Sequence, residues 1–118
     1  MKPASYIGIP YEEKDCWDLV RHIFNSELRL DIGDREKQST GIKDGRWVEV
    51  ARGNERPFDV VLIETTPLEK HVGLVTGKNR FLHTMKGVGS CEDYYNSIQW
   101  THRVKKFYRR KALQYQVL

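Results

Sequence analysis

The chain is poor in cysteine and contains no long apolar run. Cys16 and Cys91 are the two cysteines among 118 residues. A domain of this length buries enough surface to fold without disulfides, so we expect two reduced thiols, although the sequence also permits a bridge between them. No segment is apolar over the roughly 20 residues that a membrane-spanning helix needs, so no membrane span is predicted. The length corresponds to a single domain, residues 1–118.

The charges do not point to a nucleic-acid-binding protein. The chain has 20 Lys and Arg against 16 Asp and Glu, which gives a formal net charge of +4. One dense basic run, residues 103–111, favours an anionic substrate or partner. No nucleic-acid-binding motif accompanies this run, so we predict no nucleic-acid partner.

The pattern of apolar residues predicts one helix followed by strands. Apolar residues recur every three or four positions from Cys16 onward, and Asp15 is a suitable N-cap, so a helix is expected from Cys16 to about residues 28–30. Short apolar or alternating stretches bounded by turns predict strands at residues 47–50, 58–64, 71–75, 80–84 and 104–108. Further helical segments are expected around residues 34–39 and 92–97. We therefore predict an α+β fold in which the helix precedes a mostly antiparallel sheet.

Cys16 is placed where a nucleophilic thiol would be activated. At the start of a helix, unpaired backbone N–H groups and the positive end of the helix dipole favour the thiolate form. The same N–H groups can stabilise the oxyanion that forms when an amide carbonyl is attacked. Taken alone, however, a cysteine on the apolar face of a helix is more often a small core residue.

Two histidines lie on the predicted hairpin that follows. His71 begins one strand and His83 lies in the next, with a turn at residues 77–79 between them. Adjacent strands bring such side chains into contact, so the second imidazole can fix the orientation of the first. With Cys16 they form a candidate set in which the thiolate attacks, His71 takes up the proton and His83 holds His71 in one tautomer.

A metal site is the alternative for these residues. Cys16, His71, His83 and Cys91 are chemically suitable zinc ligands. Their spacing matches no compact Cys/His ligand pattern, so we predict neither a metal nor any other cofactor.

The motifs together resemble the NlpC-type cell-wall cysteine peptidases. The resemblance lies in Gly-Ile-Pro-Tyr at residues 8–11, Asp-Cys-Trp at 15–17, His-Val-Gly-Leu-Val at 71–75 and Phe-Leu-His at 81–83. Residues 57–61 are similar to the Pro-Gly-Asp-Leu segment of that family, with Phe58 in place of the glycine. The resemblance implies a minimal papain-like α+β fold, with an N-terminal nucleophile helix packed on the sheet.

The resemblance also implies an activity and a site. The expected reaction is hydrolysis of an amide bond in the peptidoglycan stem peptide, typically between D-glutamate and a diamino acid. The implied catalytic residues are the nucleophile Cys16, the general base His71 and the orienting residue His83. The implied substrate-binding residues are Tyr11, Asp15 and Trp17. Tyr11 and Asp15 match positions near the free amino end of the substrate, and Trp17 stands where serine is common, so the contact there is altered.

A narrower resemblance concerns members encoded with phage or prophage tails. It rests on Trp17 and on residues 82–84, 87–89 and 100–109. It implies a tail-associated hydrolase with other tail-tip proteins as partners. Because residues 1–6 contain no long apolar stretch, no secretory signal is predicted, and we expect synthesis in the bacterial cytoplasm and action at the cell wall from the virion tail.

The alternative is a structural tail-tip or assembly protein that keeps the peptidase fold with little or no activity. Two departures from the family pattern favour it: the loop before Asp15 is shortened to residues 12–14, and Asp18 stands where glycine is usual.

Overall fold

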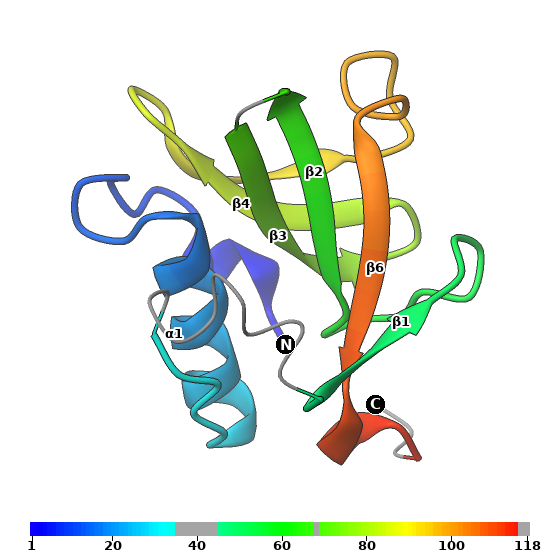
Figure 1. Ribbon diagram of the computed structural model, residues 1–118. Helices are drawn as coiled ribbons and strands as arrows, with labels where there is room; N and C mark the ends of the chain where they lie inside the picture. Colours follow the sequence, from blue (N-terminus) through cyan, green and yellow to red (C-terminus); the bar gives the residue numbers. More distant parts are fainter. Residues whose placement is uncertain (35–44, 68, 116–118) are drawn as a thin grey trace.

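The computed structural model describes residues 1–34, 45–67 and 69–115 and contains one helix and one sheet within these ranges (Figure 1). Helix α1 (Cys16–Leu28) precedes all the strands. The strands are β1 (Trp47–Val50), β2 (Val60–Thr66), β3 (Glu69–Gly77), β4 (Arg80–Met85), β5 (Gly89–Tyr94) and β6 (Val104–Arg110). Short 3₁₀ helices flank them, η1 (Pro3–Tyr6) and η3 (Lys111–Leu113). The predicted α+β class is therefore confirmed.

The sheet has the strand order β1-β6-β2-β3-β4-β5, and every neighbouring pair is antiparallel. Figure 1 shows β2, β3 and β6 running side by side, whereas β4 turns across them, so the sheet is strongly twisted. The β3–β4 and β4–β5 hairpins bring residues 71–94 together at one end of this order.

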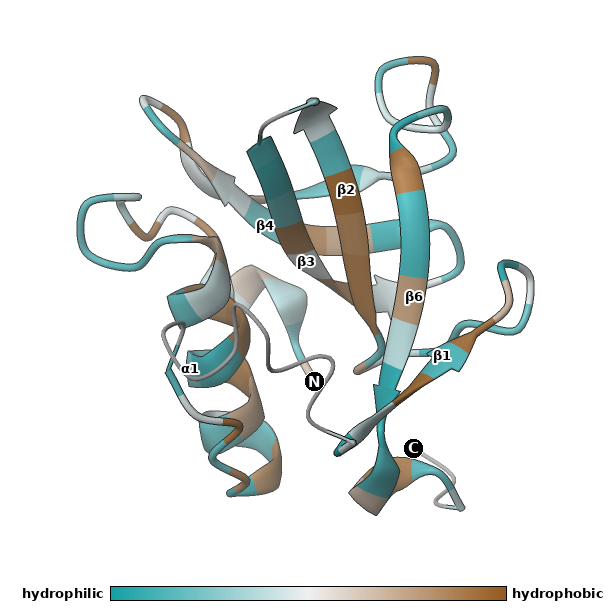
Figure 2. Cartoon of the chain, viewed as in Figure 1, coloured by the Kyte–Doolittle hydropathy of each residue, from teal (hydrophilic) through white to brown (hydrophobic). Residues whose placement is uncertain are grey.

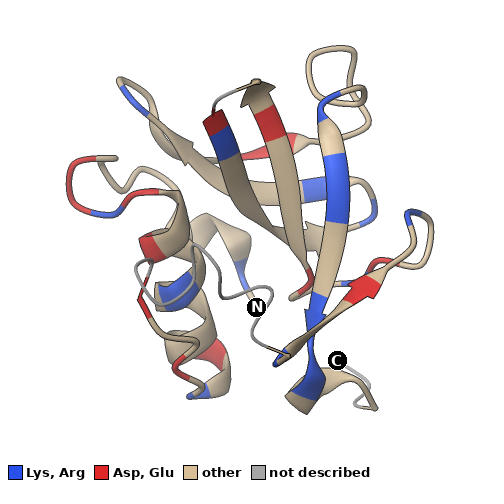
Figure 3. Cartoon of the chain, viewed as in Figure 1, with Lys and Arg blue, Asp and Glu red and all other residues tan. Residues whose placement is uncertain are grey.

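Helix α1 forms because its sequence is amphipathic and capped. The Asp15 side chain accepts a hydrogen bond from the Asp18 N–H at 3.0 Å, which satisfies one of the unpaired donors at the helix start. The buried residues of the helix are Cys16, Trp17, Leu19, Val20, Ile23 and Phe24. Figure 2 shows this apolar side turned towards the strands, and Figure 3 shows charged residues on the opposite side. The helix ends at Leu28, within the predicted limits.

Apolar residues pack on both faces of the sheet. Val60, Leu74 and Leu82 contribute to a cluster that includes the buried face of α1. Their neighbours on the same strands point to the other face, where a second cluster gathers Val61, Ile63, Val75, Phe81, Tyr95, Trp100 and Phe107. The segment that follows β5 thus covers the face of the sheet opposite α1.

One expectation about secondary structure is wrong, and another concerns residues outside the described ranges. The helical turn predicted over residues 92–97 is wrong, because Gly89–Tyr94 forms strand β5 and pairs with β4. Pairing in this hairpin satisfies the backbone groups of β4 on the side away from β3. The helix expected around residues 34–39 falls almost entirely outside the described residues.

Strand β2 begins at Val60 rather than at residue 58, because Phe58 adopts a left-handed backbone conformation with φ of 73°. This conformation costs a residue with a side chain about 1–2 kcal/mol. Burial offsets the cost, since Phe58 packs edge to face on Phe24 with a ring separation of 6.1 Å. Next to it, buried Asp59 accepts hydrogen bonds from Arg109 Nε at 2.9 Å and Nη2 at 2.7 Å, which ties the start of β2 to β6.

No helix in the described part of the chain has the length and apolar character needed to cross a membrane.

Candidate active site

Cys16 is the first residue of α1 and is 5% exposed. Helix α1 packs against β3 and β4, the strands that carry the two histidines. The first N–H groups of a helix have no carbonyl partner within the helix, so this end of α1 offers donors next to the thiol. Cys16 and Cys91 are both thiols, so the disulfide that the sequence permitted is not formed.

The segment before α1 is fastened to the edge strand β5. The Ile9 N–H donates to Ser90 Oγ at 2.8 Å, and Ser90 Oγ donates to the Tyr6 carbonyl at 2.6 Å. Two backbone hydrogen bonds join the same segments, from the Gly8 N–H to the Ser90 carbonyl and from the Ser90 N–H to the Ile9 carbonyl, each 2.9 Å long. The chain that leads into Cys16 is therefore positioned by the strand at the far end of the hairpin.

His71 and His83 are in direct contact, as the hairpin predicted. His71 Nε2 lies 2.9 Å from His83 Nδ1, and His83 is completely buried. Aromatic neighbours hold both rings: His71 stacks on Trp100 with planes 19° apart, and His83 stacks on Phe81 with planes 18° apart. The imidazole pair is thus fixed in orientation before any substrate arrives.

Gly73 makes room for this pair between the two strands. A Cβ at Gly73 would lie 2.6 Å from the Phe81 ring, 2.8 Å from the Leu82 carbonyl oxygen and 3.3 Å from His83 Cβ. The first two separations are closer than van der Waals contact allows. Only glycine permits β4 to approach β3 at this point.

We predict that Gly73→Ala destabilises the fold by about 1–3 kcal/mol, because the added methyl group pushes against a rigid ring and a backbone carbonyl. Gly77→Ala is the matched control in the same strand, since the three atoms nearest to its Cβ would all belong to the flexible end of the Arg80 side chain. Urea unfolding of both variants measures the difference. Equal losses of unfolding free energy would contradict this account of Gly73.

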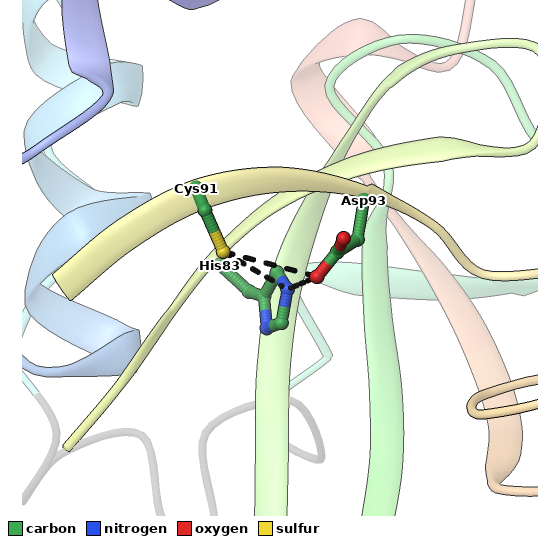
Figure 4. A group of neighbouring side chains, drawn as sticks. All are labelled: His83, Cys91 and Asp93. Atoms are coloured by element: carbon green, nitrogen blue, oxygen red, sulfur yellow. Dashed lines mark hydrogen bonds and ion pairs between the residues drawn. The ribbon is translucent and has the colours of Figure 1, made fainter. Parts of the chain in front are cut away.

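Asp93 extends the histidine pair to a third group. Its Oδ2 lies 2.8 Å from His83 Nε2 (Figure 4). His71 contacts the other ring nitrogen, Nδ1. Asp93 was not among the predicted site residues, because residues 92–97 were expected to be helical. Gly87 and Gly89 could have indicated a hairpin turn between two strands. The register of that hairpin places Asp93 on the same face as His83.

These contacts determine where the protons lie. A carboxylate only accepts hydrogen bonds, so His83 Nε2 carries a proton and donates it to Asp93. In a neutral imidazole the other nitrogen is then an acceptor, so His83 Nδ1 accepts from a proton on His71 Nε2. A neutral His71 with its proton on Nε2 has its lone pair on Nδ1. The chain Asp93–His83–His71 therefore leaves His71 Nδ1 as a base.

Burial keeps His83 neutral. Desolvation lowers the pKa of His83 below its ordinary value, and the hydrogen bond and charge of Asp93 offset only part of this shift. A neutral ring is what the proton arrangement requires.

Cys91 lies beside the same imidazole. Its Sγ is 3.6 Å from His83 Nε2 and 3.8 Å from Asp93 Oδ2. Burial, followed by the negative charge of Asp93, raises the pKa of the Cys91 thiol to about 11, so this thiol stays protonated. Within the described ranges, His83, Cys91 and Asp93 are the residues whose ligand atoms gather within 4.8 Å of one another. The zinc set suggested by the sequence is therefore not the one assembled, since Asp93 belongs to it and Cys16 and His71 do not.

The three residues expected near the substrate differ in their surroundings. Tyr11 and Asp15 are partly exposed in the segment that leads into α1, and Lys86 Nζ lies 5.8 Å from the centre of the Tyr11 ring. Trp17 is 4% exposed, belongs to the core cluster and donates its indole N–H to the Gly33 carbonyl at 2.8 Å. These contacts give Trp17 a packing role.

Comparisons with known proteins agree with the motifs. The model of the NlpC/P60 family matches residues 2–109. Murein DD-endopeptidase MepS/Murein LD-carboxypeptidase of Escherichia coli K12 is 28% identical over 89 residues, which are 75% of this chain and 45% of that protein. The protein with that name from Escherichia coli O157:H7 matches to the same extent. The chain thus spans about half the length of the curated relatives it matches.

Solved structures share the fold. The NlpC/p60 domain of peptidoglycan hydrolase SagA superimposes with a TM-score of 0.65 at 17% identity, covering 89% of this chain and 90% of that domain. An NLP/P60-family protein from Staphylococcus aureus, described as similar to lipoprotein, superimposes with a TM-score of 0.68 at 17% identity, covering 92% of this chain and 38% of that one. The predicted NlpC-type fold is confirmed.

Proposed function

The chain belongs to the NlpC/P60 family, and from this we propose that it is a cysteine peptidase that hydrolyses an amide bond in peptidoglycan stem peptides. The observation that carries the proposal is the hydrogen-bonded chain from Asp93 through His83 to His71. It leaves His71 Nδ1 as a base on a strand against which the helix of Cys16 packs. A purely structural protein has no need of a buried imidazole pair in one defined tautomer.

The reaction follows from these groups. Cys16 gives its thiol proton to His71 Nδ1, and the sulfur attacks the amide carbonyl carbon. Backbone N–H groups at the start of α1 stabilise the oxyanion. The leaving amine takes the proton from His71, and an acyl-enzyme with a carbon–sulfur bond remains. Water then attacks this thioester, and His71 receives the water proton and returns it to the sulfur.

We propose that the bond cleaved lies between D-glutamate and the diamino acid, with Tyr11 and Asp15 near the free amino end of the substrate. Mass spectrometry of purified muropeptides incubated with the protein tests this, with Cys16→Ser as the control. The expected products are a fragment ending in D-glutamate and a peptide beginning with the diamino acid. The name of the Escherichia coli relative describes a DD-endopeptidase. If the protein separates cross-linked peptides and does not cleave at D-glutamate, the bond cleaved is the cross-link and the proposed bond is wrong. If nothing is cleaved, the proposed activity is wrong.

We also propose that the protein acts from a phage or prophage tail at the cell wall, after synthesis in the bacterial cytoplasm. The likeness of Trp17 and of residues 100–109 to tail-encoded members supports this. Induction of the host followed by mass spectrometry of purified particles is the test, and particles that lack the protein would contradict it. A structural tail-tip role without hydrolysis is the second candidate, favoured by the loop at residues 12–14 and by Asp18. It predicts particles that contain the protein and muropeptides that stay intact.

Asp93 is proposed as a positioning residue for this reaction. We predict that Asp93→Asn lowers kcat by about 10- to 100-fold and leaves KM nearly unchanged, because an amide no longer forces the proton of His83 onto Nε2. Direct loss of the carboxylate that orients a catalytic histidine costs about 10⁴-fold in serine proteases, and Asp93 acts one group further away. Steady-state kinetics on a soluble stem peptide measures both constants.

Glu92→Gln is the matched control, because Glu92 is the neighbouring carboxylate on β5. It accepts a hydrogen bond from Thr76 Oγ1 at 2.5 Å and lies 4.0 Å from Arg80 Nη1, so its partners are not those of His83. Equal effects of the two variants on kcat would rule out a specific role for Asp93.

A further inference from the structure

Three different donor groups converge beside the proposed catalytic histidines. His83 and Cys91 are directly paired on β4 and β5, and Asp93 follows two positions along β5 on the same face. Figure 4 shows the imidazole, the thiol and the carboxylate pointing towards one another. His83 is fully buried, whereas Cys91 and Asp93 are partly exposed, so an ion could reach the group from the solvent side. The proposed peptidase reaction uses no atom of Cys91.

The separations of the three donor atoms match those around tetrahedral zinc. Zinc–sulfur bonds of about 2.3 Å and zinc–nitrogen or zinc–oxygen bonds of about 2.0–2.1 Å, at tetrahedral angles, put sulfur about 3.6 Å from the lighter donors. Cys91 Sγ lies 3.6 Å from His83 Nε2 and 3.8 Å from Asp93 Oδ2. His83 Nε2 and Asp93 Oδ2 are 2.8 Å apart and must separate by about half an ångström, to the value of about 3.4 Å that zinc requires.

The donor chemistry also suits zinc. A thiolate, an imidazole nitrogen and a carboxylate oxygen are all ordinary zinc ligands, and their two negative charges balance a divalent ion. Water can supply the fourth ligand on the exposed side. A metal-bound histidine usually has its second ring nitrogen hydrogen-bonded to another group. In His83 that nitrogen, Nδ1, is already hydrogen-bonded to His71.

We propose that His83, Cys91 and Asp93 form a zinc site, and that zinc bound there and peptidase activity exclude each other. Binding releases the thiol proton of Cys91 and places the lone pair of His83 Nε2 on the metal. His83 must then carry its proton on Nδ1 and donate it to His71 Nε2. The proton of His71 moves to Nδ1, where it occupies the position that would accept the proton of Cys16. The inhibition rests on the proposed function, whereas the binding of zinc does not.

Cobalt binding tests the site independently of activity. The probe is Co²⁺ titrated into the full chain with Cys16→Ser, so that Cys91 is the one remaining thiol. We expect a thiolate-to-cobalt charge-transfer band that saturates at one equivalent and is removed by one equivalent of Zn²⁺. Adding Cys91→Ser should abolish the band, and adding Asp93→Asn should weaken affinity by more than about 10-fold. Glu92→Gln, in the same background, should change affinity less than about 2-fold.

Several results would overturn the site. They are a folded Cys16→Ser protein without the band, a band that survives Cys91→Ser, and equal affinities of the Asp93→Asn and Glu92→Gln variants. Circular dichroism of each variant shows whether it is folded.

Zinc inhibition is then measured as a ratio to the zinc-free rate of the same protein. Near-stoichiometric Zn²⁺ should inhibit the wild type more than about 10-fold and inhibit Cys91→Ser less than about 2-fold. Equal inhibition of both proteins would mean that zinc acts at Cys16 and would overturn the exclusion. An inactive wild type would contradict the proposed function, while the cobalt titration would still decide whether the metal site exists.

Discussion

Cys16→Ser is expected to abolish hydrolysis of stem peptides, with a loss of about 10⁶-fold in kcat by comparison with removal of the nucleophile in a serine protease. The hydroxyl is a much poorer nucleophile than a thiolate, and the proposed reaction uses no other nucleophile of the protein. The substitution changes little volume and keeps a residue suited to a helix start. The free energy of unfolding should therefore change by about 1 kcal/mol or less. Kinetics on a soluble stem peptide and urea unfolding measure the two effects.

Cys91→Ser is the matched control for the nucleophile. It removes the second thiol, which the proposed reaction does not use, so hydrolysis in the absence of metal should persist. If Cys91→Ser eliminated hydrolysis and Cys16→Ser did not, the nucleophile would be misassigned. If neither did, the chemistry would not be thiol chemistry.

Helix α1 and most of the strands could be predicted because features of the nearby sequence mark them. Apolar side chains at helical spacing from Cys16 predicted α1, and short apolar or alternating stretches bounded by turns predicted β1 with its observed bounds and β4 to within one residue. Burial is one-sided in α1, whereas β1 and β4 have buried side chains on both faces. Strand β5 escaped prediction because its residues are small or polar, from Ser90 to Asp93, and carry no apolar alternation. Its place is set by pairing with β4 and with the segment before α1, which are contacts between distant residues.

The dependence on contacts between distant residues also explains why Cys91 and Asp93 were not predicted as neighbours of His83. The contact of His71 with His83 follows from a short hairpin turn, which is a local feature of the sequence. Asp93 and Cys91 join His83 only through the register of β4 with β5, in which His83 lies opposite Cys91. Motif spacing cannot supply that register when the strand itself is not recognised. Phe58 is a related case, because its left-handed backbone depends on packing against Phe24 across the core.

His71→Ala is expected to be nearly as damaging as loss of Cys16. Catalytic residues that act as one unit lose almost all activity when any central member is removed, so kcat should fall by about 10⁴-fold or more. His83→Ala should leave more activity, because an orienting group is partly replaceable. His71→Ala also leaves the buried Nδ1 of His83 without its donor, which should cost about 1–3 kcal/mol of unfolding free energy. Kinetics and urea unfolding together separate the loss of activity from the loss of stability.

The rate at which iodoacetamide alkylates Cys16 is a second measurement. It should not change if His71 has only a structural role. In a Cys91→Ser background, Cys16 is the one thiol available for labelling, and the thiolate is the reactive form. If His71 takes up the thiol proton, His71→Ala should slow labelling at neutral pH in a protein that is still folded. His102→Ala is the matched control, because His102 is exposed and lies outside the site. Equal labelling rates in the two variants would show that the Asp93–His83–His71 chain does not act on Cys16, and the proposed reaction would lose its base.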